Sequence, residues 1–297
     1  MSIKDYIRHL FSLKERQILG INARNIDYIF ANNPRRYYPQ VDDKLKTKLV
    51  AERAGIHFPQ TYSVVEYQQQ IKGVMNSLAN RKEFVIKPVH GSGGAGVLVI
   101  KGRKDNRFIK ASGDMLTLGD IRYHISNILS GLYSLGGVYD KALIEYRVKP
   151  DEYFKAISYK GVPDIRLIMY KQQPVMSMLR LPTRASDGRA NLHAGGIGVG
   201  IDVYTGKGVC GVQYDTPITM HPDTHLPLKD IVIDQWPTVI ELAKKLSKEV
   251  QLGYIGIDIV IDRKYGPMLL EINARPGLAI QIANGEGLLG RLRAIDY

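Results

Sequence analysis

The stretch "FVIKPVHGSGGAGVLVI", residues 84–100, places a glycine-rich turn between two apolar runs. Gly91, Gly93 and Gly96 have the spacing G-x-G-x-x-G, which several unrelated nucleotide-binding folds share. In Rossmann and Walker loops such glycines open a helix, but here they are followed by the β-branched run "VLVI". The chain also lacks G-K-[ST], H-R-D and D-F-G motifs, which argues against P-loop proteins and protein kinases.

We therefore predict a hairpin with strands at 84–89 and 97–100, whose glycine tip lies as a lid over phosphates. Lys87 precedes the tip on the first strand, and its side chain is expected to lie beside the phosphates as a point charge. A flexible turn without a ligand is the alternative interpretation.

A second hairpin is predicted in "GIDIVIDRKYGPMLLEIN", residues 256–273, with a four-residue loop at 263–266. This loop places Asp258 opposite Glu271, and Asn273 follows two residues later on the same face. Opposed carboxylates need a cation between them, and three oxygen ligands suit Mg²⁺. A loop one residue longer or shorter would turn Asp258 to the other face, and a solvated strand end is the alternative.

A third hairpin, residues 164–182, carries two arginines. A three-residue loop centred on Gln173 is expected to set Arg166 opposite Arg180. Paired guanidinium groups are costly without an anion, so we expect a γ-phosphate or an acyl phosphate there. Unliganded surface arginines are the alternative.

The composition is that of a globular protein with a basic surface. The 297 residues are 44% hydrophobic, and 41 Lys and Arg against 29 Asp and Glu give a net charge of +12. This charge favours anionic partners, but its dispersal and the lack of aromatic–basic stacking motifs argue against nucleic acid. No apolar run is long enough to span a membrane and no signal peptide is evident, so we expect a cytoplasmic protein. The single Cys210 excludes an internal disulfide, and we expect it to be a small buried residue.

Helices are expected at 1–32, 44–54, 66–79 and 236–250, and strand-like segments fill most of the remainder. Several consecutive hairpins with few helices predict an α+β fold rather than an alternating βαβ sheet.

Taken together, these motifs resemble the ATP-grasp superfamily, and within it the RimK-like α-L-glutamate ligases. The resemblance covers residues 43–282 and includes "DDKLKTKLV", "FVIKPVHGSGGAGV", "LIEYRV", "DIR", "GRANLHAGG", "GIDIV" and "LLEINARPGL". It implies an N-terminal helical extension at 1–40 and an ATP-grasp domain at 41–290. Within that domain, the glycine-loop subdomain would span about 80–145 and the metal-binding part about 146–290, and the two would grip ATP.

The resemblance also assigns the site. It implies phosphate or nucleotide contacts for Lys44, Lys87, Ser92, Gly93 and Gly94, an adenine hinge at Glu145 and Tyr146, and nucleotide contacts for Asp164, Arg189, Ala190 and Asn191. The metal ligands would be Asp258, Glu271 and Asn273, and the catalytic arginines Arg166, Arg180 and Arg275. His193 is expected to orient its loop rather than to act as a base.

The implied reaction uses ATP and one or two Mg²⁺ ions, which Mn²⁺ can replace, to phosphorylate a carboxylate that an amine or peptide then attacks. Three features differ from the RimK pattern: the short segment before Lys44, the long spacer at 149–163, and Arg275 in place of a small residue. All three bear on the acceptor. The acid is therefore glutamate or, alternatively, a cell-envelope or sugar-associated acid, and a regulatory nucleotide-binding module without turnover is the rival class. A homo-oligomer is compatible with the sequence.

Overall fold

A computed structural model describes residues 15–78, 80–91 and 93–297 of the chain. The chain forms two compact units. Of the described residues, unit 1 contains those in 15–42, 46–57 and 150–297, and unit 2 contains those in 43–45 and 58–149. The first part of the helix predicted at 1–32 and the predicted site residue Ser92 lie outside the described residues.

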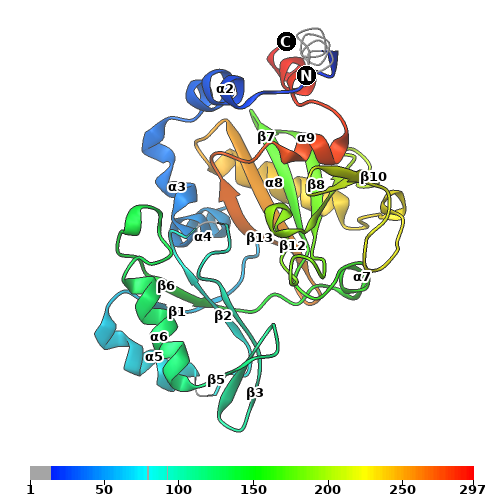
Figure 1. The fold of residues 1–297 in the computed structure, drawn as a ribbon. Helices are drawn as coiled ribbons and strands as arrows, with labels where there is room; N and C mark the ends of the chain where they lie inside the picture. Colours follow the sequence, from blue (N-terminus) through cyan, green and yellow to red (C-terminus); the bar gives the residue numbers. More distant parts are fainter. Residues whose placement is uncertain (1–14, 79, 92) are drawn as a thin grey trace, which may run out of the picture. The chain divides into compact units, whose positions relative to one another are not determined.

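Unit 2 is built on a six-stranded antiparallel sheet of order β1-β6-β2-β3-β4-β5. Its strands are β1 (Thr61–Val65), β2 (Phe84–Pro88), β3 (Leu98–Lys104), β4 (Arg107–Lys110), β5 (Met115–Leu116) and β6 (Ala142–Glu145). Its helical segments are η3 (Gln68–Gln70), α5 (Ile71–Leu78), α6 (Leu118–Leu129) and η4 (Leu135–Gly137). α5 and α6 lie together against the sheet (Figure 1). Their apolar faces form one core with Phe84, Ile86 and Ile144.

The alternation of side chains along β2 determines which of them point away from that core. Phe84 and Ile86 point into the core, so Val85 and Lys87 point to the opposite face of the sheet. β2 thus buries Phe84 and Ile86 on one face of the sheet and presents Lys87 on the other.

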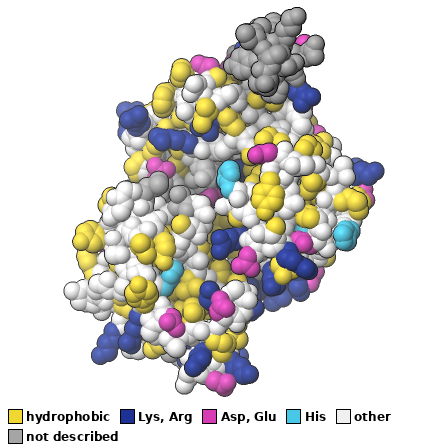
Figure 2. All heavy atoms as spheres, viewed as in Figure 1, with side chains coloured by type: hydrophobic (Ala, Val, Ile, Leu, Met, Phe, Trp, Pro, Cys, Tyr) yellow, Lys and Arg dark blue, Asp and Glu magenta, His cyan; other side chains and the backbone are white. Residues whose placement is uncertain are grey.

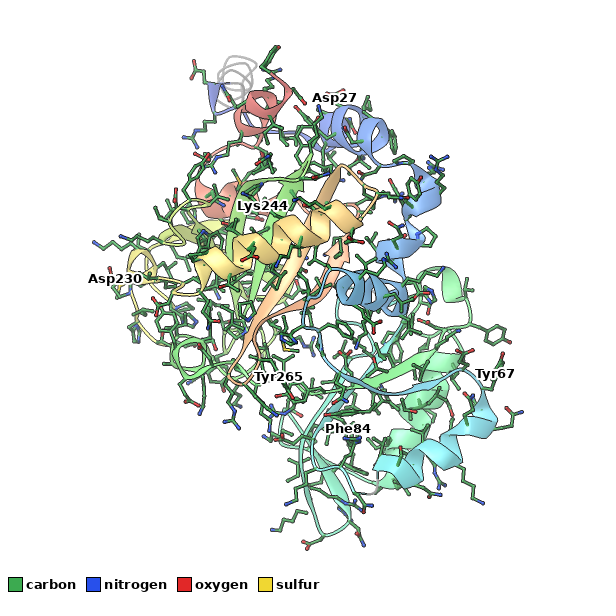
Figure 3. All side chains as sticks on the ribbon, turned by 180° about the vertical axis from the view of Figure 1, so that it is seen from behind. Asp27, Tyr67, Phe84, Asp230, Lys244 and Tyr265 are labelled. Atoms are coloured by element: carbon green, nitrogen blue, oxygen red, sulfur yellow. The ribbon has the colours of Figure 1, made fainter. Side chains whose placement is uncertain are left out.

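Unit 1 is built on a seven-stranded antiparallel sheet of order β11-β10-β9-β8-β7-β12-β13. Its strands are β7 (Asp164–Tyr170), β8 (Gln173–Leu181), β9 (Ile197–Ile201), β10 (Gly208–Gln213), β11 (Thr216–Ile218), β12 (Tyr254–Asp262) and β13 (Gly266–Asn273). α8 (Trp236–Glu249) covers one face, with Lys244 on its outer side, and α9 (Ala279–Asn284) covers the other (Figures 1 and 3). α9 and α10 (Leu289–Asp296) pack with Ile168, Met176 and Met178 in a common core.

The remaining helical segments of unit 1 are short, apart from one. They are α2 (Ile21–Ala23), η1 (Arg24–Phe30), η2 (Arg35–Tyr37), α3 (Pro39–Asp42), α7 (Glu152–Ala156), η5 (Leu192–Ala194) and η6 (Leu228–Asp230). The exception is α4 (Lys44–Arg53), most of which belongs to unit 1.

The predicted α+β class is confirmed, and most predicted elements lie within a few residues of their expected bounds. Gly55 follows α4 with a φ of +67°, a backbone conformation that favours glycine at the end of a helix. The helix predicted at 66–79 begins as the 3₁₀ turn η3 and continues as α5. Cys210 was expected to be buried, but it is only half-buried. Its thiol donates to the carbonyl of Ala283 at 3.1 Å.

None of the described helices combines the length and the apolar character needed to cross a membrane. On the face shown in Figure 2, Lys and Arg side chains are spread among acidic and apolar ones and do not gather in a single patch.

Candidate nucleotide and metal site

The two carboxylates of the second hairpin lie opposite each other, as predicted. Asp258 on β12 pairs with Glu271 on β13, and Asn273 pairs with Gly256 two positions away. The loop that leads to this register is shorter than predicted. The loop has three residues, 263–265, because Asp262 pairs with Gly266, and a bulge between Asp258 and Ile259 then shifts the pairing back by one residue.

The register predicted for the arginine hairpin is wrong. Arg166 lies opposite Met178, and Arg180 lies opposite Asp164. The turn contains only Lys171 and Gln172, both with positive φ, so β7 and β8 meet sooner than a three-residue loop would allow. This turn alone would displace the pairing by three residues, but a bulge between Ile168 and Met169 restores one. The net displacement of two residues keeps both arginines on the same face of the sheet.

The partners of these arginines are carboxylates of the protein. Arg166 donates to both oxygens of Asp258, from Nε at 2.7 Å and from Nη2 at 2.6 Å. Arg180 donates to Asp164 from Nε at 2.5 Å and to Asp258 Oδ2 from Nη2 at 2.8 Å. The anion that the arginines were predicted to require is therefore supplied, in this structure, by two aspartates of unit 1.

Burial strengthens the attraction between the charges of this cluster. Asp258 is fully buried, and the arginine side chains are 13% and 14% exposed, so solvent screens the charges little. Burial alone would raise the pKa of Asp258, but the charges of Arg166 and Arg180 outweigh it and hold that pKa below its usual range. Burial and the nearby Asp258 charge raise the pKa of Asp164, against the opposing effect of Arg180.

Glu271 lies at the more exposed edge of this cluster. The two arginines contact Asp164 and Asp258, and Arg166 Nη2 lies 4.0 Å from Glu271 Oε1. The Glu271 side chain is 36% exposed, whereas Asp258 is fully buried. The more open side of the cluster therefore presents a carboxylate.

The donor set of this face fits Mg²⁺, which prefers oxygen ligands from one or two carboxylates. The amide of Asn273 bridges the two acids, with Nδ2 at 3.3 Å from Asp258 Oδ2 and 3.5 Å from Glu271 Oε1. A rotation of this amide would turn its oxygen towards the same point. Within the described part of the chain, no group of three or more His, Cys, Asp or Glu side chains could hold a metal ion. A metal on this face would therefore need Asn273 as well as the two acids.

Unit 2 presents a buried Lys–Glu pair beside the glycine loop. Lys87 Nζ lies 2.5 Å from Glu145 Oε1, and both side chains are less than 10% exposed. Lys87 pairs with Leu143 across the sheet, and Glu145 pairs with Val85. The predicted phosphate lysine and the predicted hinge glutamate are thus in direct contact.

Three glycines of the loop have backbone conformations that favour glycine. Gly93, Gly94 and Gly96 all have positive φ. A Cβ on Gly96 would lie 2.6 Å from the ring of Tyr133, whereas nothing lies within 4 Å of one on Gly93. The predicted hairpin is confirmed, because the segment that follows the glycine loop is the strand β3, which pairs with β2, and not a helix.

A clamp at the base of this loop escaped the sequence analysis. The buried carboxylate of Asp140 accepts hydrogen bonds from the backbone N–H groups of His90 and Lys141, at 2.9 and 2.7 Å, and from Ser134 Oγ at 2.9 Å. It also contacts His90 Nδ1 at 2.8 Å. The only sequence signal was a lone aspartate just before a strand, which is too common to single out.

Lys44 completes this clamp from the carbonyl side. Its Nζ donates to the carbonyl of Val89 at 3.2 Å and to that of Gly91 at 2.6 Å. The lysine predicted to contact nucleotide therefore also holds the start of the glycine loop.

The other predicted residues lie on loops and strand ends of the two units. Tyr146 follows β6, and its N–H donates to the carbonyl of Gln60 at 2.8 Å. Arg189 is exposed, Ala190 and Asn191 are half-buried, and the Asn191 side chain caps η5 by accepting from the N–H of His193. Arg275 is exposed and lies over the ring of Tyr38, 5.2 Å from its centroid.

Antiparallel sheets with a glycine hairpin in unit 2 and a carboxylate–arginine cluster in unit 1 are the architecture of an ATP-grasp protein. A family model, "Sugar-transfer associated ATP-grasp", matches residues 23–297. The chain belongs to this family.

Solved structures share the fold at low sequence identity. D-alanyl-alanine synthetase A from Vibrio cholerae is 12% identical, with a TM-score of 0.50 over 86% of this chain and 63% of that one. D-alanine–D-alanine ligase from Helicobacter pylori is 17% identical, with a TM-score of 0.50 over 86% and 61%. The ATP-grasp ligase PsnB, solved with a minimal precursor, is 12% identical, with a TM-score of 0.48 over 89% and 62%.

This chain thus spans less than two thirds of the length of each of these proteins. A comparison with curated protein sequences found no match.

Proposed function

We propose that this chain is an ATP-dependent carboxylate–amine ligase that forms an amide bond through an acyl-phosphate intermediate. The observation that carries the proposal is the face of β12 and β13, where Asp258, Glu271 and Asn273 lie within reach of one another beside two arginines. Such chemistry needs charge neutralisation and alignment rather than a protein nucleophile.

In this proposal unit 2 binds the nucleotide. Lys87 and the glycine loop hold phosphate, and the segment from Glu145 to Tyr146 meets the adenine. Glu145 holds the Lys87 ammonium group in place, and Asp140 and Lys44 fix the start of the loop. Gly93 and Gly94 leave the backbone open to the phosphates, because a side chain would block that approach.

Unit 1 supplies the groups that act on the transferred phosphoryl group. Arg166 and Arg180 would stabilise its charge, and Asp164 would position Arg180 rather than contact the ribose, because the Asp164 carboxylate is buried against that guanidinium. Arg189, Ala190 and Asn191 are proposed to contact ATP, and Arg275 to bind the carboxylate substrate.

Asp258, Glu271 and Asn273 would hold Mg²⁺, which supplies neutralisation of phosphate charge when it is bound. Asp258 would then be shared between the metal and the two arginines. Its two oxygens have enough lone pairs for both, and Glu271 adds a second carboxylate ligand.

Two acids remain candidates for the substrate. The resemblance to RimK-like ligases favours glutamate added to an amine or peptide. The family description, sugar-transfer associated, is loosely in line with a cell-envelope or sugar-associated acid.

The first test is replacement of the proposed metal ligand with its amide. Glu271→Gln is expected to lower ADP release with Mg²⁺, ATP and a panel of acids and amines by at least about 10³-fold, while leaving the fold intact because this side chain is partly exposed. Asp230→Asn, on an exposed aspartate of η6, is the matched control. Undiminished turnover in Glu271→Gln would refute the metal assignment.

The second test identifies the product. Mass spectrometry of the same panel is expected to show an amide between one acid and one amine, together with ADP and phosphate. Absence of any ADP release above background from the wild-type protein would refute the ligase proposal and favour the regulatory alternative.

A further inference from the structure

A single buried amide joins the ends of β12 and β13. Asn33 lies three residues beyond η1, precedes Pro34 and is 2% exposed. Its Nδ2 donates to the carbonyl of Tyr254 at 2.7 Å and to that of Ala274 at 3.2 Å, and its Oδ1 accepts from the N–H of Tyr254 at 2.9 Å. All three of these bonds go to backbone groups at the two strand ends.

This amide takes a place in the sheet that a longer β13 would fill. The last pair between the two strands is Gly256 with Asn273. Continued in the same register, the ladder would next bond Tyr254 to Arg275, because bonded pairs alternate along antiparallel strands. Both backbone groups of Tyr254 are bonded to Asn33 instead. β13 therefore ends at Asn273, and Arg275 lies outside the ladder.

The turn that follows β13 is held by two further contacts. A Cβ on Gly256 would lie 2.6 Å from Pro276, so the lack of a side chain there lets this proline pack on β12. The carbonyl of Pro276 accepts from Arg24 Nη1 at 2.9 Å, and Arg24 is 8% exposed. Arg24 at Pro276 and Asn33 at Ala274 thus fix the two ends of this turn.

Asparagine suits this position because its amide carries the donor and the acceptor of a peptide group. Leucine has nearly the same shape, but it would leave the backbone groups of Tyr254 and the carbonyl of Ala274 without these partners. Both residues are buried, and an unpaired backbone group is costly there. Loss of the amide is therefore expected to loosen the strand ends, and Asn273 is the residue directly before Ala274.

We propose that Asn33 is a positioning residue of the candidate metal site. By ending β13 at Asn273, it keeps the amide of that residue beside Asp258 and Glu271, at 3.3 and 3.5 Å. This inference rests on the proposed function, which makes these three residues the metal ligands. The N-terminal segment, expected to be an extension outside the ATP-grasp domain, thereby contributes to the site.

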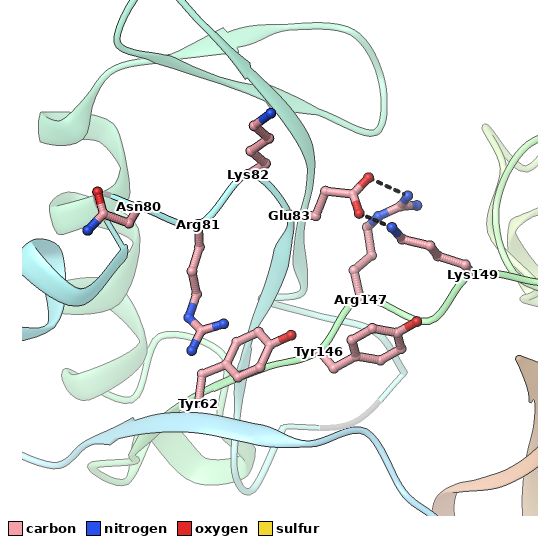
Figure 4. Close-up of a pocket in the computed structure, with 8 residues that line it drawn as sticks. All are labelled: Tyr62, Asn80, Arg81, Lys82, Glu83, Tyr146, Arg147 and Lys149. Carbon is pink, nitrogen blue, oxygen red and sulfur yellow. Dashed lines mark hydrogen bonds and ion pairs between the residues drawn. The ribbon is translucent and has the colours of Figure 1, made fainter. Parts of the chain in front are cut away.

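The nucleotide contacts proposed for unit 2 involve other residues. The hinge residue Tyr146 lines the cavity shown in Figure 4, where Glu83 contacts Arg147 and Lys149. Asn33 and the strand ends that it joins belong to unit 1. A change at Asn33 is therefore expected to alter the affinity for ADP with metal and not the affinity for ADP alone.

The test measures how strongly Mn²⁺ tightens ADP binding, as the ratio of the calorimetric Kd values without and with the metal. Asn33→Leu is expected to lower this ratio by about tenfold or more, the usual effect of losing a group that orients a metal ligand. The Kd for ADP alone should change less than about twofold, because the two sites lie in different units.

Arg24→Met is the second variant, for use if the circular dichroism melting curve of Asn33→Leu shows that it does not fold. It removes the donor to the Pro276 carbonyl but keeps an unbranched apolar stem. It is expected to lower the same ratio by about threefold or more.

The matched control is Asn32→Ala, which removes the neighbouring amide, whose Nδ2 donates to the carbonyl of Tyr28. It is expected to change the ratio less than about twofold. An unchanged ratio in Asn33→Leu, or in Arg24→Met where Asn33→Leu does not fold, would overturn the inference. This includes an equal loss of both affinities, which would indicate a merely structural role.

The reference variant Glu271→Gln separates this inference from the proposed function. If Glu271→Gln lowers the ratio and Asn33→Leu does not, the metal assignment stands and the positioning role is wrong. If Mn²⁺ does not tighten ADP binding by the wild-type protein, the metal assignment and the inference are both wrong.

Discussion

At the scale of single residues, Asp258 joins three strands of the candidate site through its carboxylate. Glu271 lies opposite it on one neighbouring strand and Arg166 on the other, so one row across the sheet runs acid, acid, arginine. Arg180 reaches the same carboxylate from β8. Removing one member of such a buried set leaves the others with uncompensated charge, which costs more than the pair contributes.

Asp164→Ala tests this reasoning. It leaves Arg180 with one carboxylate instead of two, in a site where both side chains are less than 15% exposed. We expect the free energy of unfolding, measured by urea titration, to fall by about 3 kcal/mol. Asp230→Ala, on an exposed aspartate, should change it by less than about 0.5 kcal/mol. A loss below about 1 kcal/mol for Asp164→Ala would show that the pair with Arg180 contributes little.

At the scale of elements, the β2–β3 hairpin depends on glycine for two separate reasons. Gly93 needs a positive φ in open space, whereas Gly96 needs a positive φ and also lies against Tyr133. The carbonyl of Gly96 is 2.9 Å from His124 Nε2, so α6 fixes this end of the loop.

The two glycines therefore predict unequal costs. Gly93→Ala should lower the free energy of unfolding by about 1 kcal/mol, the cost of a left-handed alanine. Gly96→Ala should lower it by at least about 2 kcal/mol, because the new Cβ also displaces the Tyr133 ring. Urea titration of both variants compares them directly, and equal losses would contradict the packing argument.

The Asp140 clamp gives a second prediction for this hairpin. Asp140→Asn keeps the shape of the side chain but replaces one acceptor oxygen with a donor that faces N–H and O–H groups. We expect a loss of about 2 kcal/mol in the free energy of unfolding and weaker ADP binding by calorimetry. Ser134→Ala removes one of the bonds and should have about half the effect on stability. Full ADP affinity in Asp140→Asn would mean that the clamp does not shape the nucleotide site.

At the scale of the whole molecule, each unit contains a histidine whose pKa is lowered on folding, His221 fully buried in unit 1 and His124 half-buried in unit 2. In unit 1, His221 Nδ1 accepts from the N–H groups of Asp223 and Thr224, and the side chain is fully buried. In unit 2, His124 contacts the carbonyl of Gly96. Burial lowers the pKa of both, against smaller opposing effects of the Pro182 carbonyl and Asp223 on His221, and of Gly96 on His124.

The sign of the pH dependence follows from these lowered pKa values. Below about pH 6.5 the unfolded chain binds protons that the folded chain resists, so stability falls as the pH drops through this range and is fully present above it. The raised pKa of Asp164 acts in the opposite direction in the same range, because the folded chain protonates this carboxyl more readily than the unfolded chain does. As the pH is lowered from about 7.5 to about 5.5, we expect the histidines to make the urea midpoint of the wild-type protein decrease more steeply than it would without them. In His221→Asn, whose amide oxygen can still accept from the backbone, the fall should be shallower. The same slope in both proteins would show that His221 titrates normally in the folded state.

Local patterns in the sequence were sufficient to predict much of the fold and of the candidate site. Glycines followed by β-branched residues predicted a hairpin rather than a helix, and alternation along residues 256–273 brought Asp258 opposite Glu271. That register was right although its loop was one residue too long, because the bulge beside Asp258 compensated. A strand side chain has only two faces to occupy, so an error of two residues in pairing, as between β7 and β8, leaves it on the correct face, whereas an error of one does not.

By itself, then, the sequence determined which residue types face one another along each hairpin, since that depends on local alternation and turn composition. Only the tertiary structure decided which groups neutralise them. Arg166 and Arg180 hold Asp258 because β7 pairs with β12, about ninety residues away in the chain. Contacts of this kind depend on strand order in the sheet, and no local spacing in the chain encodes that order.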